Sequence, residues 1–151
     1  MKMKLADYIA PEGVLFDLDA SSKTEALQLM SAGLSKPSGL PVDAILTALQ
    51  KRENLGSTGV GQGIAIPHTR IDGIEKPIGL LARMRKPIDF ESIDDLPVDI
   101  IFVLLTPNRD TNKHLNVLAA FSRKLRSPGA LKQMRTAKDA QSLYTLFVSL
   151  P

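Results

Sequence analysis

Residues 56–70, GSTGVGQGIAIPHTR, hold most of the groups in this chain that could do chemistry. The segment contains one of only two histidines, His68, and Pro67 directly before it. Three of its glycines occupy alternate positions: Gly59, Gly61 and Gly63. Glycines leave backbone amides uncovered and permit positive φ angles, so such a run can meet an anion. We interpret the segment as one that holds His68 in place, with Pro67 restricting its backbone.

Two further residues could act together with His68. His114 falls in the first turn of an expected helix, where unpaired amides attract anions and the helix dipole favours a neutral imidazole ring. Arg52 ends the apolar stripe of another expected helix, four residues before the glycine segment. Together they could form a phosphate pocket, with His68 as nucleophile, His114 as hydrogen-bond donor and Arg52 as charge clamp. Purely structural roles stay open, at the core edge for His114 and as a snorkelling side chain for Arg52.

Other chemistries fit the sequence less well. Neither G-x-x-x-x-G-K-[ST] nor G-x-G-x-x-G occurs, which argues against a nucleotide cradle. The chain has no cysteine and only two histidines, so we expect no metal site and no cofactor. A serine hydrolase would need the absent nucleophile elbow G-x-S-x-G. A general-base histidine in a small-molecule enzyme stays open, but no residue names its substrate.

The composition indicates an ordinary globular protein. The chain has 151 residues, 44% of them hydrophobic and 23% charged, which suits one domain with a real core. Its longest strongly apolar run, residues 100–105, is too short to span a bilayer, and the N-terminus lacks the apolar region of a secretory signal. We therefore expect a cytoplasmic location without membrane insertion. A net charge of +3, with scattered basic residues and 5% aromatics, argues against nucleic-acid binding.

Hydrophobic periodicity and helix-capping patterns predict alternating strands and helices. Ser21 or Ser22, followed by Glu25, is typical of a capping box. The expected strands are residues 14–18, 63–66, 77–84 and 98–106, and the expected helices begin near residues 22, 41, 111, 130 and 139. Residues 98–106 are apolar on both faces and should lie centrally, whereas residues 69–76 look like a polar connection. This order predicts one α/β domain, residues 1–151, with a mixed β-sheet flanked by helices on both faces.

The helix after residue 110 should carry one apolar face. Asp110 or Thr111 is placed to cap it. Its expected core face contains His114, Leu118, Phe121 and Leu125, with Leu115 and Ala119 alongside.

Residues 52–68, RENLGSTGVGQGIAIPH, resemble the active-site signature of the IIA proteins of the bacterial phosphotransferase system. The similarity is greatest to the nitrogen-related branch and its fructose- and mannitol-specific relatives. Further matching segments are residues 87–107, 114–126 and the AKDAQSLYTL ending. The resemblance covers essentially the whole chain.

The resemblance implies the same single α/β domain and a phosphocarrier activity. In such proteins the first histidine accepts a phosphoryl group from a histidine phosphocarrier protein, while the second histidine and the arginine support it. These roles correspond here to His68, His114 and Arg52. We also expect hydroxyls and amides of the glycine segment to contact the phosphate: Ser57, Thr58, Gly59, Gly61 and Gly63. Thr69 and Arg70 depart from the residues that relatives often carry after the histidine, and this could alter the pocket rim.

The absence of a fused transport or IIB segment favours a regulatory component that acts on downstream target proteins, in nitrogen, carbon or potassium homeostasis. A sugar-specific IIA that relays phosphate to a transporter stays open, as does a module that binds an anion without turnover. We expect an apolar surface around His68 to meet the carrier, with Leu55, Ile71 and Ile74 as candidates.

Overall fold

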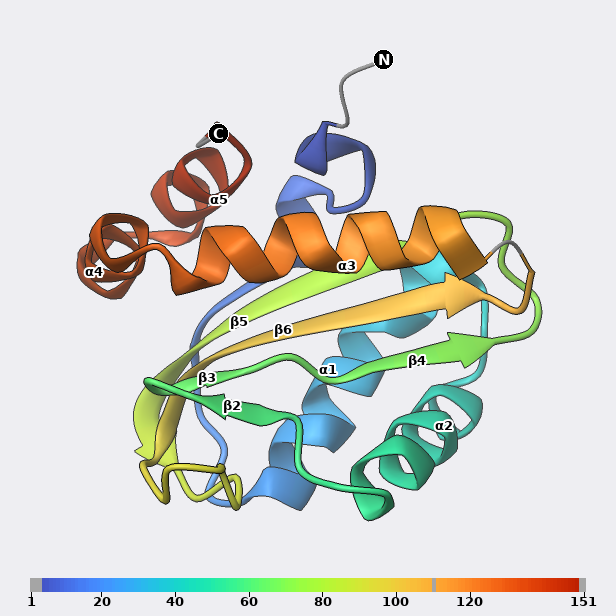
Figure 1. Cartoon of the computed structure of the whole chain (residues 1–151), viewed down its shortest axis with the longest axis horizontal. Coiled ribbons are helices and arrows are strands. Elements are labelled where there is room, and N and C mark those ends of the chain that lie inside the picture. The colour runs from blue at the N-terminus through green and yellow to red at the C-terminus, as the bar shows by residue number, and fades with distance from the viewer. Residues whose placement is uncertain (1–3, 110, 150–151) are drawn as a thin grey trace.

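The computed structural model describes residues 4–109 and 111–149, and only the backbone of residues 111–113. Six strands form one mixed sheet between two layers of helices (Figure 1). Two short 3-10 helices, η1 (Leu5–Asp7) and η2 (Pro11–Gly13), precede the first strand. The strands are β1 (Val14–Leu18), β2 (Gly59–Gly61), β3 (Ile64–Ala65), β4 (His68–Ile71), β5 (Ile78–Ile88) and β6 (Val98–Pro107). The α-helices are α1 (Lys23–Ser38), α2 (Val42–Asn54), α3 (Thr111–Arg126), α4 (Pro128–Thr136) and α5 (Ala140–Ser149).

Strand β6 lies at the centre of the sheet, as its apolar sequence predicts. It pairs antiparallel with β5 and parallel with both β3 and β4. The pairs Ala65–Ile101 and His68–Leu104 keep the same register, so β3 and β4 run along the same side of β6, with Ile66 and Pro67 between them. Strand β1 pairs parallel with β5 at the other edge, and β2 pairs antiparallel with β3.

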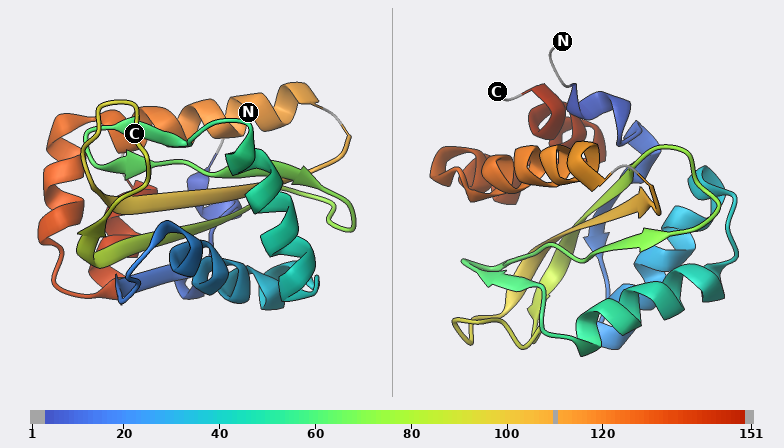
Figure 2. Two further views of the ribbon diagram at one scale, coloured as in Figure 1. Left: turned by 90° about the horizontal axis from the view of Figure 1, so that it is seen from below. Right: turned by 45° about the vertical axis from the view of Figure 1, so that its right-hand side comes forward.

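The two helical layers bury different faces of the sheet (Figure 2). Helices α1 and α2 cover one face through a cluster that includes Met30, Leu34 and Leu49. Helices α3, α4 and α5 cover the other through a cluster that includes three aromatic rings. The ring centroids of Phe102 and Phe121 lie 4.2 Å apart, and Phe147 completes the group. The prediction of a mixed sheet with helices on both faces is therefore confirmed.

The first and last described elements meet on the α3 side of the sheet. Helix α5 contacts η1, and the hydroxyl of Tyr144 donates a hydrogen bond to the carbonyl oxygen of Ile9 at 3.0 Å. Burial raises the pKa of Tyr144 further above neutral pH, where this hydroxyl is protonated and acts as a donor.

Most predicted elements are confirmed, and their caps follow from local residues. Ser22 caps α1 by accepting a hydrogen bond from the amide of Glu25, while the Glu25 carboxylate accepts one from the amide of Ser21. Pro41 is the N-cap of α2 and not its first residue. The predicted cap of α3 involves Asp110 or the side chain of Thr111 and lies outside the described residues.

Two strands lie where the sequence predicted none. Residues 69–76 were expected to form a polar connection, but His68–Ile71 form β4. Likewise Gly59–Gly61 form β2 within the glycine segment. Their polar and glycine-rich sequences do not indicate strands, because both segments are held extended by hydrogen bonds to neighbouring strands.

Candidate active site

His68 opens β4 at the edge of the sheet and is half-buried. Its Nδ1 atom lies 2.7 Å from the carbonyl oxygen of Ile66. A carbonyl oxygen can only accept, so Nδ1 carries the proton and the lone pair of a neutral ring lies on Nε2. Pro67 between the two residues has a fixed φ, and its carbonyl oxygen accepts a hydrogen bond from Leu104 of β6 at 3.0 Å. The backbone thus sets both the tautomer and the orientation of His68.

His114 shares a pocket with His68. The pocket has a volume of about 240 Å³ and is lined by His68, Thr69, Arg70, Leu104, Thr106, His114, Leu115 and Leu118. His114 is buried in the first turn of α3, and its Nδ1 has no hydrogen-bond partner among the described residues. Among the described residues, no carboxylate lines this pocket. The structure therefore brings the two histidines together around a space in which the described lining residues carry no negative charge.

Arg52 does not line this pocket. It lies half-buried in the last turn of α2, and its guanidinium donates a hydrogen bond to the carbonyl oxygen of Gly56 at 3.0 Å. It lines a neighbouring hollow of about 400 Å³ together with Lys51 and Leu55. Thr69 and Arg70 line both hollows. Arg52 thus lies next to the histidine pocket across β4, with its charge directed to its own loop.

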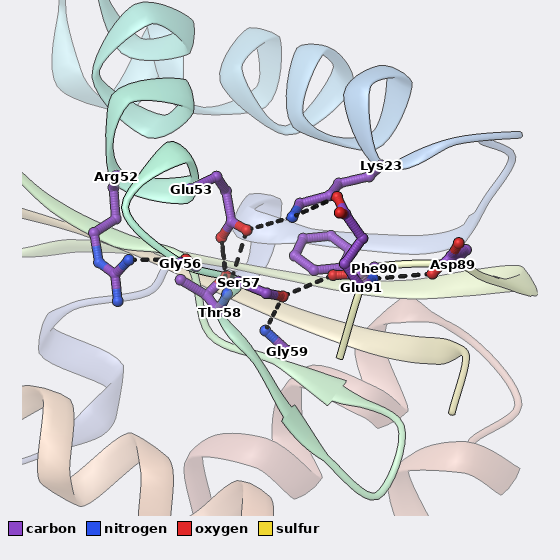
Figure 3. Close-up of polar contacts among 10 residues, drawn as sticks. All are labelled: Lys23, Arg52, Glu53, Gly56, Ser57, Thr58, Gly59, Asp89, Phe90 and Glu91. Atoms are coloured by element: carbon purple, nitrogen blue, oxygen red, sulfur yellow. Dashed lines mark hydrogen bonds and ion pairs between the residues drawn. The ribbon is translucent and has the colours of Figure 1, made fainter. Parts of the chain in front are cut away.

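The hydroxyls of the glycine segment bind protein groups (Figure 3). The Ser57 hydroxyl donates to the carbonyl oxygen of Phe90 at 2.7 Å and accepts from the amide of Gly59 at 3.1 Å. Both the amide and the hydroxyl of Thr58 donate to the carboxylate of Glu53. These donors are already used, and Glu53 is an anion. This arrangement disfavours a phosphate at Ser57, Thr58 and Gly59.

Gly61 and Gly63 belong to the tight hairpin between β2 and β3. Gln62 and Gly63 form its two-residue turn with φ angles of 60° and 80°, the pattern of a type I′ turn. A Cβ atom on Gly63 would lie 2.9 Å from the carboxylate of Asp99. Neither Gly61 nor Gly63 lines the histidine pocket. Their glycine identity is explained by the turn and by close packing, and their phosphate-binding role stays a prediction.

Comparison with protein families identifies the chain. The model of the phosphoenolpyruvate-dependent sugar phosphotransferase system EIIA 2 family matches residues 7–149. The chain belongs to this family. A nitrogen regulatory protein of Bradyrhizobium diazoefficiens is 42% identical over 149 residues, which are 99% of this chain and 97% of that protein. A fructose-specific EIIA component of Haloferax volcanii is 39% identical over 101 residues, 67% of this chain and 66% of that protein.

The solved structures agree with this assignment. The crystal structure of the nitrogen regulatory protein IIA-Ntr from Neisseria meningitidis matches with a TM-score of 0.90 and 31% identity. The match covers 95% of this chain and 98% of that one. The predicted resemblance to the IIA proteins of the phosphotransferase system is therefore confirmed.

The surface around the histidines of this IIA protein differs in part from the prediction. Leu55 is 85% exposed, as a carrier-contact residue should be, but Ile71 and Ile74 are buried in the core on the α1–α2 side. Both side chains pack in the core cluster under α1 and α2, at the end of β4 and in the turn that follows it. Leu115 is 59% exposed and lines the histidine pocket, although it was expected alongside the core face of α3. Ala119 was expected there too and is exposed.

Two functional features were not predicted from the sequence. Thr106 and Leu104 approach His68 through the pairing of β4 with β6, which the sequence does not reveal. Glu53 is buried beside the glycine segment, and its position next to Arg52 in a polar run gave no sign of this. In the described residues, no cluster of three potential metal ligands occurs and no helix is both long and apolar enough to cross a bilayer.

Proposed function

We propose that the chain, as a single IIA-type domain over residues 1–151, is a phosphocarrier whose His68 Nε2 accepts a phosphoryl group. The donor is the phosphohistidine of a histidine phosphocarrier protein. One observation carries the proposal: the 2.7 Å contact of His68 Nδ1 with the Ile66 carbonyl oxygen leaves the lone pair on Nε2. A neutral imidazole with a fixed tautomer is a competent nucleophile without any metal or cofactor.

The transfer step is a displacement at phosphorus. The Nε2 lone pair of His68 forms the new N–P bond, while the N–P bond of the donor breaks and its electron pair returns to the donor nitrogen. The His68 ring keeps its Nδ1 proton and becomes positively charged. The hydrogen bond to the Ile66 carbonyl oxygen is then charge-assisted and stronger than before.

His114 and Arg52 stabilise the charge on the transferred group. His114 is buried in the same pocket and supplies a hydrogen-bond donor near the phosphoryl oxygens. Arg52 exchanges the Gly56 carbonyl oxygen for a phosphoryl oxygen, which requires its side chain to move across the rim formed by Thr69 and Arg70. The phosphoryl group adds a charge of roughly −2, enough to change which partner binds.

The output of this carrier is regulatory. Its similarity to proteins named nitrogen regulatory protein supports a role in nitrogen regulation. Within the same proposal, the chain acts in the cytoplasm on downstream target proteins in nitrogen, carbon or potassium homeostasis, without binding nucleic acid or inserting into a membrane. The similarity to a fructose-specific EIIA component supports a second candidate, a relay of phosphate to a sugar transporter. Deletion separates them, because only the second candidate predicts the loss of uptake of one sugar.

Phosphate mapping tests the proposed chemistry. The chain is incubated with phosphoenolpyruvate, the general phosphotransferase enzyme and the histidine phosphocarrier protein, and the modified residue is located by mass spectrometry. We expect one acid-labile, base-stable phosphate on His68, and 31P–15N coupling to Nε2. Absence of label would refute the phosphocarrier and leave an anion-binding module, whereas equal label on His68→Ala would refute His68 as the acceptor.

A further inference from the structure

Glu53 is a buried carboxylate in the last turn of α2 that the proposed chemistry does not use. The residue is 8% exposed, and its Oε2 lies 2.6 Å from the ammonium of Lys23 in the first turn of α1. A buried charge is costly unless it is paired and hydrogen-bonded. The remaining acceptor capacity of Glu53 is directed to one residue, Thr58, which is also buried.

A continuous series of hydrogen bonds connects Glu53 to His68. The Thr58 amide and hydroxyl donate to the Glu53 carboxylate, with amide-to-oxygen distances of 3.2 Å. The Thr58 carbonyl oxygen accepts a hydrogen bond from the amide of Ile66 at 2.9 Å. The Ile66 carbonyl oxygen is the acceptor of His68 Nδ1. The acceptor that sets the tautomer of His68 therefore belongs to a residue held by Thr58, which Glu53 holds in turn.

Further contacts hold Lys23 in place beside Glu53 (Figure 3). Its ammonium lies 4.8 Å above the ring of Phe90 and 3.6 Å from a carboxylate oxygen of Glu91. The Phe90 carbonyl oxygen binds the hydroxyl of Ser57 at 2.7 Å. Three separate segments, α1, α2 and the loop after β5, thus meet at the residues that precede the β2–β3 hairpin.

We propose that Glu53 is a positioning residue for phosphoryl transfer, acting through Thr58 and Ile66 on the orientation and tautomer of His68. The inference rests on the proposed function for its kinetic part. Small displacements of a nucleophile from its attack geometry are costly: about 1 Å can reduce a rate by about 100-fold. Loss of the Glu53 charge leaves Lys23 without its main partner and loosens Thr58, so the Ile66 carbonyl oxygen no longer has a fixed position.

Two substitutions test the series at different points. Glu53→Gln keeps the shape of the side chain but loses its charge. The glutamine amide has an NH2 group in place of one carboxylate oxygen, so only its single oxygen can accept a hydrogen bond from Thr58 or Lys23. Thr58→Val removes the hydroxyl and keeps the amide. For both we expect kcat for phosphoryl transfer to fall about tenfold, with an unchanged KM for the carrier protein. We also expect the 15N shifts of the His68 ring to move from the Nδ1–H tautomer toward a mixture.

The controls separate positioning from stability. Thr58→Ser keeps both donors and should restore the wild-type rate and ring shifts. Asp99→Asn removes a carboxylate that binds Arg135 at 2.8 Å near the start of β6, whereas His68 pairs near its end. It should lower the free energy of unfolding without changing kcat or the His68 shifts.

The ring shifts make the outcome decisive. They require no phosphate, so they test the series even if the wild-type protein is never phosphorylated, a result that would refute only the proposed function. Wild-type shifts and kcat in both folded Glu53→Gln and Thr58→Val would overturn the inference and leave Glu53 a stability residue. If Glu53→Gln does not fold, the contrast between Thr58→Val and Thr58→Ser decides alone.

Discussion

The histidine pocket and the Glu53 cluster are both polar regions at the sheet edge, yet they differ in how far their polar groups are hydrogen-bonded or ion-paired within the protein. In the Glu53 cluster, formed by Lys23, Glu53 and Thr58, the charged and polar side chains all have partners among the described residues. In the histidine pocket, His68 has a described partner on Nδ1 only, and the Nδ1 of His114 has none in that part of the chain.

This difference separates two tasks. A fully satisfied polar cluster fixes the backbone, because moving any member leaves a buried group unpaired. Groups that lack partners retain their hydrogen-bonding capacity for an incoming ligand. We therefore expect substitutions in the pocket to affect phosphoryl transfer more than folding, and substitutions that leave a charge unpaired in the cluster to affect folding strongly.

The largest effect is expected for His68→Ala. Loss of Nε2 removes the acceptor atom, so phosphorylation by the carrier should be abolished, measured as radiolabel retained at alkaline pH. The half-buried ring contributes little to the core, so the free energy of unfolding should change by less than about 1 kcal/mol. Residual label at another residue would show that His68 is not the sole acceptor, and the contrast between the histidine pocket and the Glu53 cluster would no longer hold.

His114→Ala should reduce the rate of transfer about 100-fold, because it removes one donor to the developing charge. Single-turnover labelling by quench flow measures this rate. The label should still map to His68. A wild-type rate would show that His114 only fills the core edge.

Lys23→Met tests the cluster from the side of the cation. It leaves the buried Glu53 carboxylate without its ion pair and should lower the free energy of unfolding by about 3 kcal/mol, measured by urea denaturation. Arg85→Met is the matched control, since Arg85 and Asp19 are both exposed and lie 3.8 Å apart. That change should cost less than about 1 kcal/mol. Equal costs would show that the Lys23–Glu53 ion pair stabilises the fold no more than an exposed pair does.

Arg52→Lys should slow transfer about tenfold and leave folding nearly unchanged. A lysine keeps the charge but not the planar fork that can bind two phosphoryl oxygens. If the free energy of unfolding falls by more than the activation free energy of transfer rises, Arg52 serves to hold its own loop through the Gly56 carbonyl oxygen and not to bind phosphate.

The smallest effect is expected for Leu115→Ser at the pocket rim. Leu115 is exposed beside both histidines, so its loss should raise KM for the carrier protein about threefold without changing kcat. Leu29→Ser is the matched control, because Leu29 is an exposed leucine of α1 that lines neither hollow. A change in kcat with Leu115→Ser would show that this residue affects the transfer step and not only the binding of the carrier protein.

The sequence predicts the elements that carry strong periodicity. The buried face of α1, the central strand β6 and the α5 helix all follow from apolar spacing and local caps. Strand β4 could not be predicted, because His68, Thr69 and Arg70 are polar and become a strand only through pairing with β6. The same pairing brings Leu104 and Thr106 to the pocket.

The candidate site is predicted in part for a similar reason. The positions of His68 and His114 follow from the sequence pattern and the family resemblance, and the structure brings them into one pocket. The glycines were interpreted as ligand contacts, whereas Gly63 has φ 80° in a tight turn against Asp99. Local sequence reveals that glycine is needed but not whether a turn or a ligand needs it.

The position of α5 has a practical consequence. Helix α5 lies toward one end of α3, while the beginning of α3 and the end of β4 lie at the other end, and η1 contacts both α5 and α3 (Figure 1). We therefore expect a fluorescent label or a second polypeptide joined near α5 to leave the histidine pocket accessible. The fold could then be attached by one side while the proposed phosphoryl transfer takes place at the other.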